Sequence, residues 1–273
     1  MNAPDVGWRL DPTVLVPLAL YAGVYVWRFV RARREGGGRG AGPRQALAFA
    51  GALLVLLVAI VSPLDELGER YLFSAHMVQH LLLGDIAPLL ALLALSRVIM
   101  RAASRRLVGV ERALGRFAHP LTGLALWLVL IYVWHVPALY QAALRDPFVH
   151  ALEHVSFFTA GLALWWPLVQ PVPMRHRLTG LGSLGYIAAA KAGLAALGLY
   201  LVWSSTVAYP FYETAPRIWE LSAREDQNVG GAIMMIEQSL VLVLFFVVTF
   251  VRMLGQSEKE QRRRERLEDA AAA

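Results

Sequence analysis

Five of the seven histidines in the sequence lie in or beside apolar stretches, at spacings that suit a metal ion. His76 and His80 are four residues apart, as are His150 and His154, so each pair would lie on one face of a helix. Two imidazoles one turn apart can chelate one ion, and imidazole suits copper, zinc, iron and nickel. His135 could supply a fifth nitrogen or hold other ligands in place. We therefore predict a metal site formed by these five histidines.

Further candidate ligands, or residues that orient the ligands, are Glu153, Asp226, Met234 and Met235. Thioether sulfur is a soft ligand that favours Cu(I), although methionine in an apolar helix more commonly serves packing. The sequence has no cysteine, which excludes thiolate metal sites, disulfides and cysteine nucleophiles. The residues alone therefore leave copper, zinc, iron and nickel as candidate ions.

The elements that must position these residues are apolar stretches long enough to cross a membrane. Charged residues make up only 17% of the 273 residues, below the roughly 25% of an ordinary soluble domain. About 20 apolar residues cross the hydrocarbon core, and a backbone in lipid must satisfy its own hydrogen bonds, so these stretches are predicted to be helices. We predict an all-α bundle of seven transmembrane helices in residues 1–255 and a charged cytoplasmic tail in residues 256–273. The predicted spans are residues 12–30, 45–61, 71–95, 120–140, 148–169, 184–203 and 229–253.

Basic residues gather in the segments on one side of the predicted bundle, at residues 28–44, 97–116, 175–177 and 252–266. Because cytoplasmic loops carry an excess of Lys and Arg, this pattern predicts an N-terminus outside and a C-terminus in the cytoplasm. It also puts the five histidines near the outer ends of the third, fourth and fifth spans. The net charge of +6 then reflects topology, and we expect a lipid bilayer and not nucleic acid as the partner.

Ionisable residues also fall deep inside the predicted spans. Lys191 lies midway along the sixth span, Glu237 about a third of the way along the seventh, and Asp85 within the third. We predict a buried and mainly structural ion pair of Lys191 and Glu237. Pro88 and Pro137 are expected to kink or loosen the third and fourth helices.

Four motifs, taken in order along the chain, resemble the CtaG family. They are SAHMVQHLLL from Ser74, WHVPALY from Trp134, HALEH from His150, and DQNVGG from Asp226 followed by Met234. The resemblance extends from the second span to the seventh. CtaG proteins are seven-helix proteins of bacterial membranes associated with the assembly of haem–copper cytochrome c oxidases.

The resemblance to CtaG implies a function that composition alone could not. It implies a multi-pass, non-enzymatic assembly factor of the bacterial cell membrane, which supplies copper to an oxidase or chaperones one of its subunits. Its partners would be cytochrome c oxidase subunits or other oxidase assembly factors. A cysteine-containing copper-delivery protein has shared the CtaG name, and the absence of cysteine excludes that protein here.

Three other functions compete with this interpretation. The stretch from His150 to His154 matches the H-x-x-E-H pattern of zinc metalloproteases, with Glu153 as general base, although the chain offers no large soluble domain for a substrate cleft. Histidines on facing helices can also ligate haem, but pairs four residues apart do not suit axial ligation. A transporter would require an internal repeat, which the seven predicted spans do not display.

Overall fold

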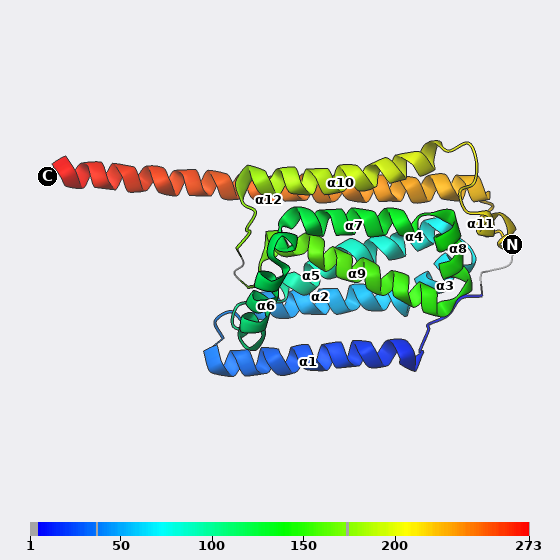
Figure 1. The fold of residues 1–273 in the computed structure, drawn as a ribbon, viewed down its shortest axis with the longest axis horizontal. Coiled ribbons are helices and arrows are strands. Elements are labelled where there is room, and N and C mark those ends of the chain that lie inside the picture. Colours follow the sequence, from blue (N-terminus) through cyan, green and yellow to red (C-terminus); the bar gives the residue numbers. More distant parts are fainter. Residues whose placement is uncertain (1–4, 37, 173–174, 273) are drawn as a thin grey trace.

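The computed structural model describes residues 5–36, 38–172 and 175–272, and every regular element within these ranges is a helix. The predicted all-α class is therefore confirmed. The main helices lie alongside one another and run alternately in opposite directions, except that α4 and α5 continue one another as one segment (Figure 1). In chain order they are α1 (Pro12–Gly36), α2 (Pro43–Ile60), α4 (Phe73–Leu81), α5 (Ala87–Leu93), α7 (Pro120–Trp134), α9 (Pro147–Val169), α10 (Gly180–Trp203) and α12 (Ala223–Ala272).

Short helices cover both ends of this bundle (Figure 1). One end carries α3 (Pro63–Arg70), α8 (Pro137–Arg145) and α11 (Pro210–Thr214), each of which begins with a proline whose fixed φ suits a first turn. The opposite end carries α6 (Arg101–Leu114) and a 3₁₀ turn, η2 (Gly115–Ala118). The axis bends by 75° between this segment and α7. None of these short helices was predicted, because the prediction used only apolar stretches long enough to cross a membrane.

Five helices are long and apolar enough to cross a membrane: α1, α2, the combined segment Phe73–Leu93, α10 and α12. The bent segment of α6, η2 and α7 brings the number to six. α9 lies among these helices with 23 residues, but His150, Glu153 and His154 lower its mean hydropathy. Many large apolar side chains are exposed on the helices, including Leu54, Val129 and Phe250, and a bilayer would cover such surfaces.

The predicted third span consists of α4, a π-helical turn η1 (Leu82–Ile86) and α5. Pro88 has no backbone N–H, so the carbonyl of Gly84 loses its usual helical partner four residues later. Trp127 of α7 donates its indole N–H to this carbonyl at 3.3 Å. The expected loosening near Pro88 therefore takes the form of a π turn, which contains Asp85.

The helix predicted over residues 120–140 ends earlier, at Trp134. A proline disfavours the helical conformation in the residue before it, and Val136, which precedes Pro137, has a ψ of 126°. The chain restarts at Pro137 as α8. His135 is consequently the residue that ends α7, and not a residue within a continuous span.

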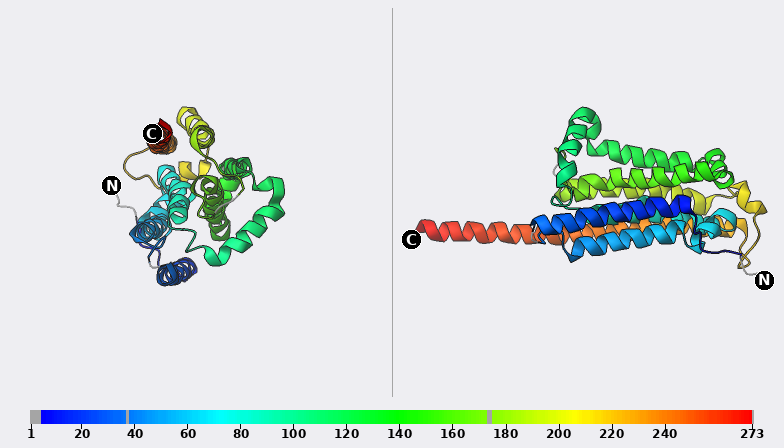
Figure 2. Two further views of the ribbon diagram at one scale, coloured as in Figure 1. Left: turned by 90° about the vertical axis from the view of Figure 1, so that its left-hand side faces the viewer. Right: turned by 90° about the horizontal axis from the view of Figure 1, so that it is seen from below.

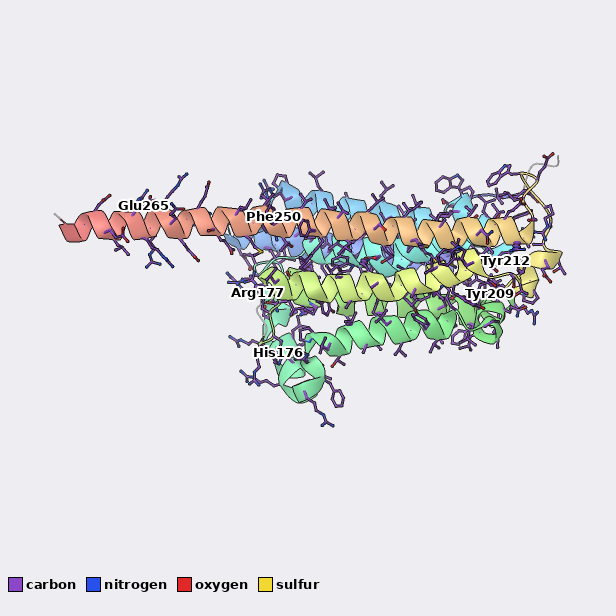
Figure 3. All side chains as sticks on the ribbon, turned by 90° about the horizontal axis from the view of Figure 1, so that it is seen from above. His176, Arg177, Tyr209, Tyr212, Phe250 and Glu265 are labelled. Carbon is purple, nitrogen blue, oxygen red and sulfur yellow. The ribbon has the colours of Figure 1, made fainter. Side chains whose placement is uncertain are left out.

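The seventh predicted span and the charged tail form one continuous helix, α12. Its C-terminal part extends beyond the bundle (Figures 1 and 3), as the position of Glu265 in Figure 3 illustrates. Residues 256–270 are all exposed, and this part carries ion pairs one turn apart, such as Arg262 with Glu258 at 3.9 Å. The tail is helical because its charged residues are good helix formers that follow directly on an apolar helix.

Close helix packing sets the position of the central helices. A Cβ atom on Gly161 of α9 would lie 2.3 Å from the carbonyl oxygen of Gly84 and 2.6 Å from Pro88 Cγ. Similarly, a Cβ on Gly231 of α12 would lie 2.7 Å from the carbonyl oxygen of Gly198 in α10. Only glycine allows such approaches. In the end-on view α1 lies at the edge of the bundle (Figure 2).

Candidate metal centre

The five predicted histidines come together at the end of the bundle that carries α3, α8 and α11. Ring centroids are 4.1 Å apart for His76 and His80, and 4.0 Å apart for His150 and His154. Between the pairs, His76 lies 5.5 Å from His150, and His80 lies 6.0 Å from His154. His135, at the end of α7, lies 6.1 Å from His80. α4, α7 and α9 thus each contribute to one histidine cluster.

Three tyrosines border this cluster. Tyr140 of α8 stacks on Tyr209 with centroids 3.9 Å apart, and its hydroxyl lies 3.2 Å from that of Tyr212. Its ring is 5.1 Å from that of His76. The hydroxyl of Tyr209 donates to the carbonyl of His135 at 3.0 Å. Figure 3 shows Tyr209 and Tyr212 at this end of the molecule.

Most polar atoms of the cluster have no hydrogen-bond partner. Among the described residues, the buried side-chain atoms without a partner include both nitrogens of His76 and His80, Nε2 of His135, His150 and His154, and both carboxylate oxygens of Glu153. Buried polar groups are normally paired, because leaving one unpaired costs about 1–3 kcal/mol. A metal ion would satisfy one nitrogen of each histidine that it binds, together with the carboxylate.

His76, His80 and Glu153 form what we call the inner group, whose ligand atoms all lie within 4.8 Å of one another. Glu153 Oε1 is 3.6 Å from His80 Nε2, and Oε2 is 4.0 Å from His76 Nε2. These distances are too long for hydrogen bonds. An ion bonded at about 2.1 Å to its ligands holds them within about 4.2 Å of one another, so small side-chain rotations would complete a site.

Asp65 of α3, His150 and His154 form the outer group, again with ligand atoms within 4.8 Å of one another. His150 Nδ1 lies 2.7 Å from Glu69 Oε1. A carboxylate bonded to one ring nitrogen is the usual arrangement that orients the other nitrogen toward a metal. The outer group borders a cavity of about 460 Å³ between α1, α2 and α9.

Arg9, in the segment before α1, pairs with two carboxylates beside the outer group. Its Nη1 lies 2.6 Å from Asp65 Oδ2 and 3.0 Å from Glu69 Oε1. Burial raises the pKa of Asp65, and the charge of Glu69 adds to this effect, whereas Arg9 opposes it. Burial alone would raise the pKa of Glu69, but His150 and Arg9 hold it below its usual value. Arg9 is therefore the counter-ion of two carboxylates at the mouth of the cluster.

His135 and Met234 approach the cluster from the opposite side. The Nδ1–H of His135 donates to the carbonyl of Ile131 at 2.8 Å, which leaves Nε2 with a free lone pair. Both residues line a cavity of about 20 Å³ next to His80, which has room for about one water molecule. Met234 is the predicted methionine whose side chain reaches the cluster.

Comparisons with known proteins identify the family of the chain. A family model described as cytochrome c oxidase caa3 assembly factor (Caa3_CtaG) matches residues 23–256. The chain belongs to this family. The matched range contains every histidine of the cluster, and the resemblance seen in the sequence motifs is confirmed.

Curated proteins similar to this chain include two mycobacterial proteins. The uncharacterized protein ML1998 of Mycobacterium leprae is 24% identical over 97% of this chain, and the uncharacterized protein Mb0105 of Mycobacterium bovis is 24% identical over 96%. The chain spans 42% of the length of each. No solved structure matches the chain.

Several residues predicted for the site of this family member have other neighbours. Asp226 caps the N-terminus of α4, where it accepts hydrogen bonds from the backbone N–H groups of Phe73 and Ser74 at 2.6 and 3.1 Å. Met235 packs against α10, with its Cγ 3.0 Å from where a Cβ on Gly198 would lie. Each contact joins two helices that are distant in sequence. The position of a residue along its helix gives its depth in the bundle, but it does not give the direction in which the side chain points.

The predicted ion pair has a different acid in the structure. Lys191 of α10 pairs with Asp85 of the π turn and not with Glu237. Glu237 is half-buried and accepts a hydrogen bond from Gln238. The π turn directs the side chain of Asp85 toward α10. A regular α-helix has a different number of residues per turn, so its geometry does not predict this direction.

The sequence pattern missed Arg9, Asp65 and Glu69. They belong to a short helix and to a segment before the first span, which the pattern treats as loops. One feature of the sequence could have indicated the two carboxylates. Asp65 and Glu69 are four residues apart between two apolar stretches, and this spacing puts both side chains on one face of a helix.

Proposed function

We propose that this caa3 assembly factor binds a copper ion at the histidine cluster and passes it to a cytochrome c oxidase during assembly. The observation that carries the proposal is the set of buried imidazole nitrogens and the Glu153 carboxylate that have no hydrogen-bond partner among the described residues. Such a set is unfavourable without a cation and becomes favourable with one. Copper is the cargo of the protein in this proposal.

Copper fits the donor set better than the alternatives. Imidazole binds Cu, Zn and Ni, and a thioether adds affinity for Cu(I). Met234 is 2% exposed and lines the same small cavity as His80 and His135. A reduced ion could therefore use its sulfur, whereas Zn²⁺ is bound by nitrogen, oxygen and thiolate ligands.

The proposal includes a seven-span topology with the histidine cluster toward the outside. α7 and α9 would cross the bilayer together with the five helices that qualify by length and hydropathy. In support, the chain alternates direction through α1, α2, α4–η1–α5, α7, α9, α10 and α12 (Figure 1). The arginine-rich α6 and the basic end of α12 lie at the end opposite the cluster, as the positive-inside rule requires of a cytoplasmic face.

Copper binding by the purified protein in detergent tests the proposal. We expect the wild-type protein to retain copper after dialysis and the His76→Ala/His80→Ala double variant to lose most of the ion bound by the inner group. Metal content is measured by mass spectrometry of the dialysed protein. Unchanged copper content in this variant would show that His76 and His80 do not bind the ion.

A matched control comes from the two remaining histidines. His119 and His176 lie near one another at the opposite end of the bundle, with ring centroids 5.2 Å apart, and Figure 3 shows His176 at that end. The His119→Ala/His176→Ala variant removes the same number of imidazoles and should bind copper as the wild type does. Equal losses in both double variants would indicate a non-specific effect.

The delivery step is tested in the host cell. Deletion of the gene should yield a terminal oxidase depleted of copper, and the chain carrying His119→Ala/His176→Ala should restore it. The His76→Ala/His80→Ala chain should not. Normal copper occupancy of the oxidase after deletion would contradict delivery and leave chaperoning of a subunit as the assembly function.

The geometry gives less support to the competing functions. A protease of the H-x-x-E-H type needs its glutamate beside substrate and water, but Glu153 is 0% exposed and faces His76 and His80. A haem held by two histidines needs them on opposite faces of its ring. His150 and His154, which line the larger cavity, lie one turn apart on the same helix, and the cavity beside His80 and His135 measures only about 20 Å³. We therefore propose a binding function and not an enzymatic one.

A further inference from the structure

We propose that the outer group of Asp65, His150 and His154 is a second copper site, which receives the ion from outside before the inner group takes it. This inference rests on the proposed function, because it divides one histidine cluster into two successive sites for the same cargo. It also assigns a metal-binding role to α3, which lies outside every predicted span.

Each group is a complete ligand set of its own. The outer group combines two imidazoles with the carboxylate of Asp65, and the inner group combines two imidazoles with the carboxylate of Glu153. Three protein ligands hold an ion and leave a position open for exchange. In the outer group Nε2 of His150 and of His154 are buried without a partner among the described residues, and Glu69 holds the His150 ring from the other side.

The two groups differ in their access to the outside. The cavity of about 460 Å³ is lined at its polar end by Arg9, Asp65, Glu69, His150 and His154. None of the inner-group residues lines it. An ion that enters through this cavity therefore meets the outer group first.

The two groups are also close enough for direct transfer. The rings of His76 and His150, one from each group, have centroids 5.5 Å apart. Glu153 lies one turn after His150 on α9, and its carboxylate belongs to the inner group. An ion could thus exchange imidazoles one at a time without leaving protein ligands.

Arg9 supplies positive charge to the outer group in the metal-free protein. Its guanidinium is bonded to Asp65, and Asp65 also accepts a hydrogen bond from Gln79 at 2.5 Å. A divalent ion would replace the guanidinium at Asp65, while Glu69 offers Arg9 an alternative partner at 3.0 Å. The carboxylate of Asp65 therefore keeps a cationic partner when the ion arrives, and Arg9 keeps an anionic one.

The number of copper ions bound per chain tests the inference. Purified protein in detergent is equilibrated with Cu(II) chloride and dialysed, and its copper content is measured. We expect two ions in the wild type, one in Asp65→Asn, and one in His76→Ala/His80→Ala. Asparagine retains a carbonyl that can accept the hydrogen bond from Gln79, so this substitution removes charge with little change in shape.

A neighbouring variant and a second outer-group variant serve as controls. Glu66→Gln changes the residue next to Asp65 on α3, whose carboxylate contacts Gly7 outside the outer group, and should leave two ions. His154→Gln should leave one, so that the inference stays testable if Asp65→Asn does not fold.

The possible outcomes separate this inference from the proposed function. A single ion in the wild type that is lost equally in the outer and inner variants would show one shared site and overturn the two-site inference, while copper binding itself stands. Two ions retained in both Asp65→Asn and His154→Gln would also overturn it. A wild type without bound copper would contradict the proposed function.

Discussion

At the scale of single residues, the charge with the most closely fixed surroundings is that of Lys191, which lies deeper in the bundle than the histidine cluster. Lys191 is 1% exposed and pairs with Asp85, which is equally buried. The carboxylate of Asp85 also accepts the indole N–H of Trp165 at 2.7 Å. The Lys191 ammonium lies 5.6 and 5.4 Å from the ring centroids of Trp127 and Trp165, within the range of cation–π attraction. Each charge therefore depends on the other and on these two rings.

Replacing Lys191 with methionine should lower the free energy of unfolding by about 3–5 kcal/mol, because it leaves the carboxylate of Asp85 buried without its partner. Unfolding by SDS in mixed micelles, followed by circular dichroism, measures the difference. The double variant Lys191→Met/Asp85→Leu removes both charges and should recover most of the stability. An equal loss in the single and double variants would mean that packing, and not charge, is responsible.

Individual residues were predictable where the signal is local in sequence. The histidine pairs are four residues apart, so their shared face follows from helical geometry alone. Asp65 and Glu69 meet the histidines, and Arg9 meets these two carboxylates, through contacts across 56 to 89 positions of the chain. A single sequence does not show which residues at such distances face one another. The same limit explains why the partner of Lys191 is Asp85 and not Glu237, since choosing between two acids requires the rotation of each helix.

At the scale of helices, the contact of α9 with the central α4–η1–α5 segment positions the two histidine pairs. Gly161 is the point of closest approach, because its Cα faces the Gly84 carbonyl. That carbonyl is available because Pro88 cannot donate to it. The π turn and the glycine contact thus belong to one arrangement, which sets the distance between His80 on one helix and His154 on the other.

The variant Gly161→Ala should separate these helices. The added methyl would lie 2.3 Å from a backbone oxygen that cannot rotate away, and overpacking of this kind typically costs about 1–3 kcal/mol. We expect a lower midpoint of thermal unfolding in detergent and weaker copper binding, because His150 and His154 move away from His76 and His80.

Gly185→Ala is the matched control for the helix contact. A Cβ at Gly185, in the membrane helix α10, would meet no described atom within 4 Å. Alanine should be neutral there or stabilise the helix by up to about 1 kcal/mol. If both alanine variants bind copper as the wild type does, the glycine contact does not set the geometry of the site.

The helices themselves were predictable to different degrees. Long apolar stretches predict five of the helices, and most of the predicted ends lie within a few residues of the observed ones. These helices are α1, α2, α9, α10 and the membrane part of α12. The break at Trp134 depends on Pro137, whose effect on the preceding residue decides between a kink and a new helix. For the tail of α12 the sequence left a short helix and disorder as alternatives, because charge patterns alone do not distinguish a solvated helix from disorder.

At the scale of the whole molecule, the proposed orientation gives the structure two chemically different ends. The end with α3, α8 and α11 carries the histidine cluster and the cavity leading to it. The opposite end carries the basic α6 and the long charged extension of α12 (Figure 1). Copper intake from outside therefore requires the first end to face outward, and the positive-inside rule independently requires the second end to face the cytoplasm.

The absence of cysteine from the chain allows a direct test of this orientation. A single cysteine placed in the wild-type chain is its only thiol, so a membrane-impermeant maleimide reports the side on which that residue lies. Arg145→Cys lies at the exposed end of α8, whereas Arg39→Cys and Lys259→Cys lie at exposed positions near the other end. We expect Arg145→Cys to be labelled in intact cells, and the other two only after the membrane is permeabilised. Labelling of Arg39→Cys in intact cells without labelling of Arg145→Cys would reverse the orientation and place the mouth of the cavity in the cytoplasm, so that copper would have to be loaded from inside.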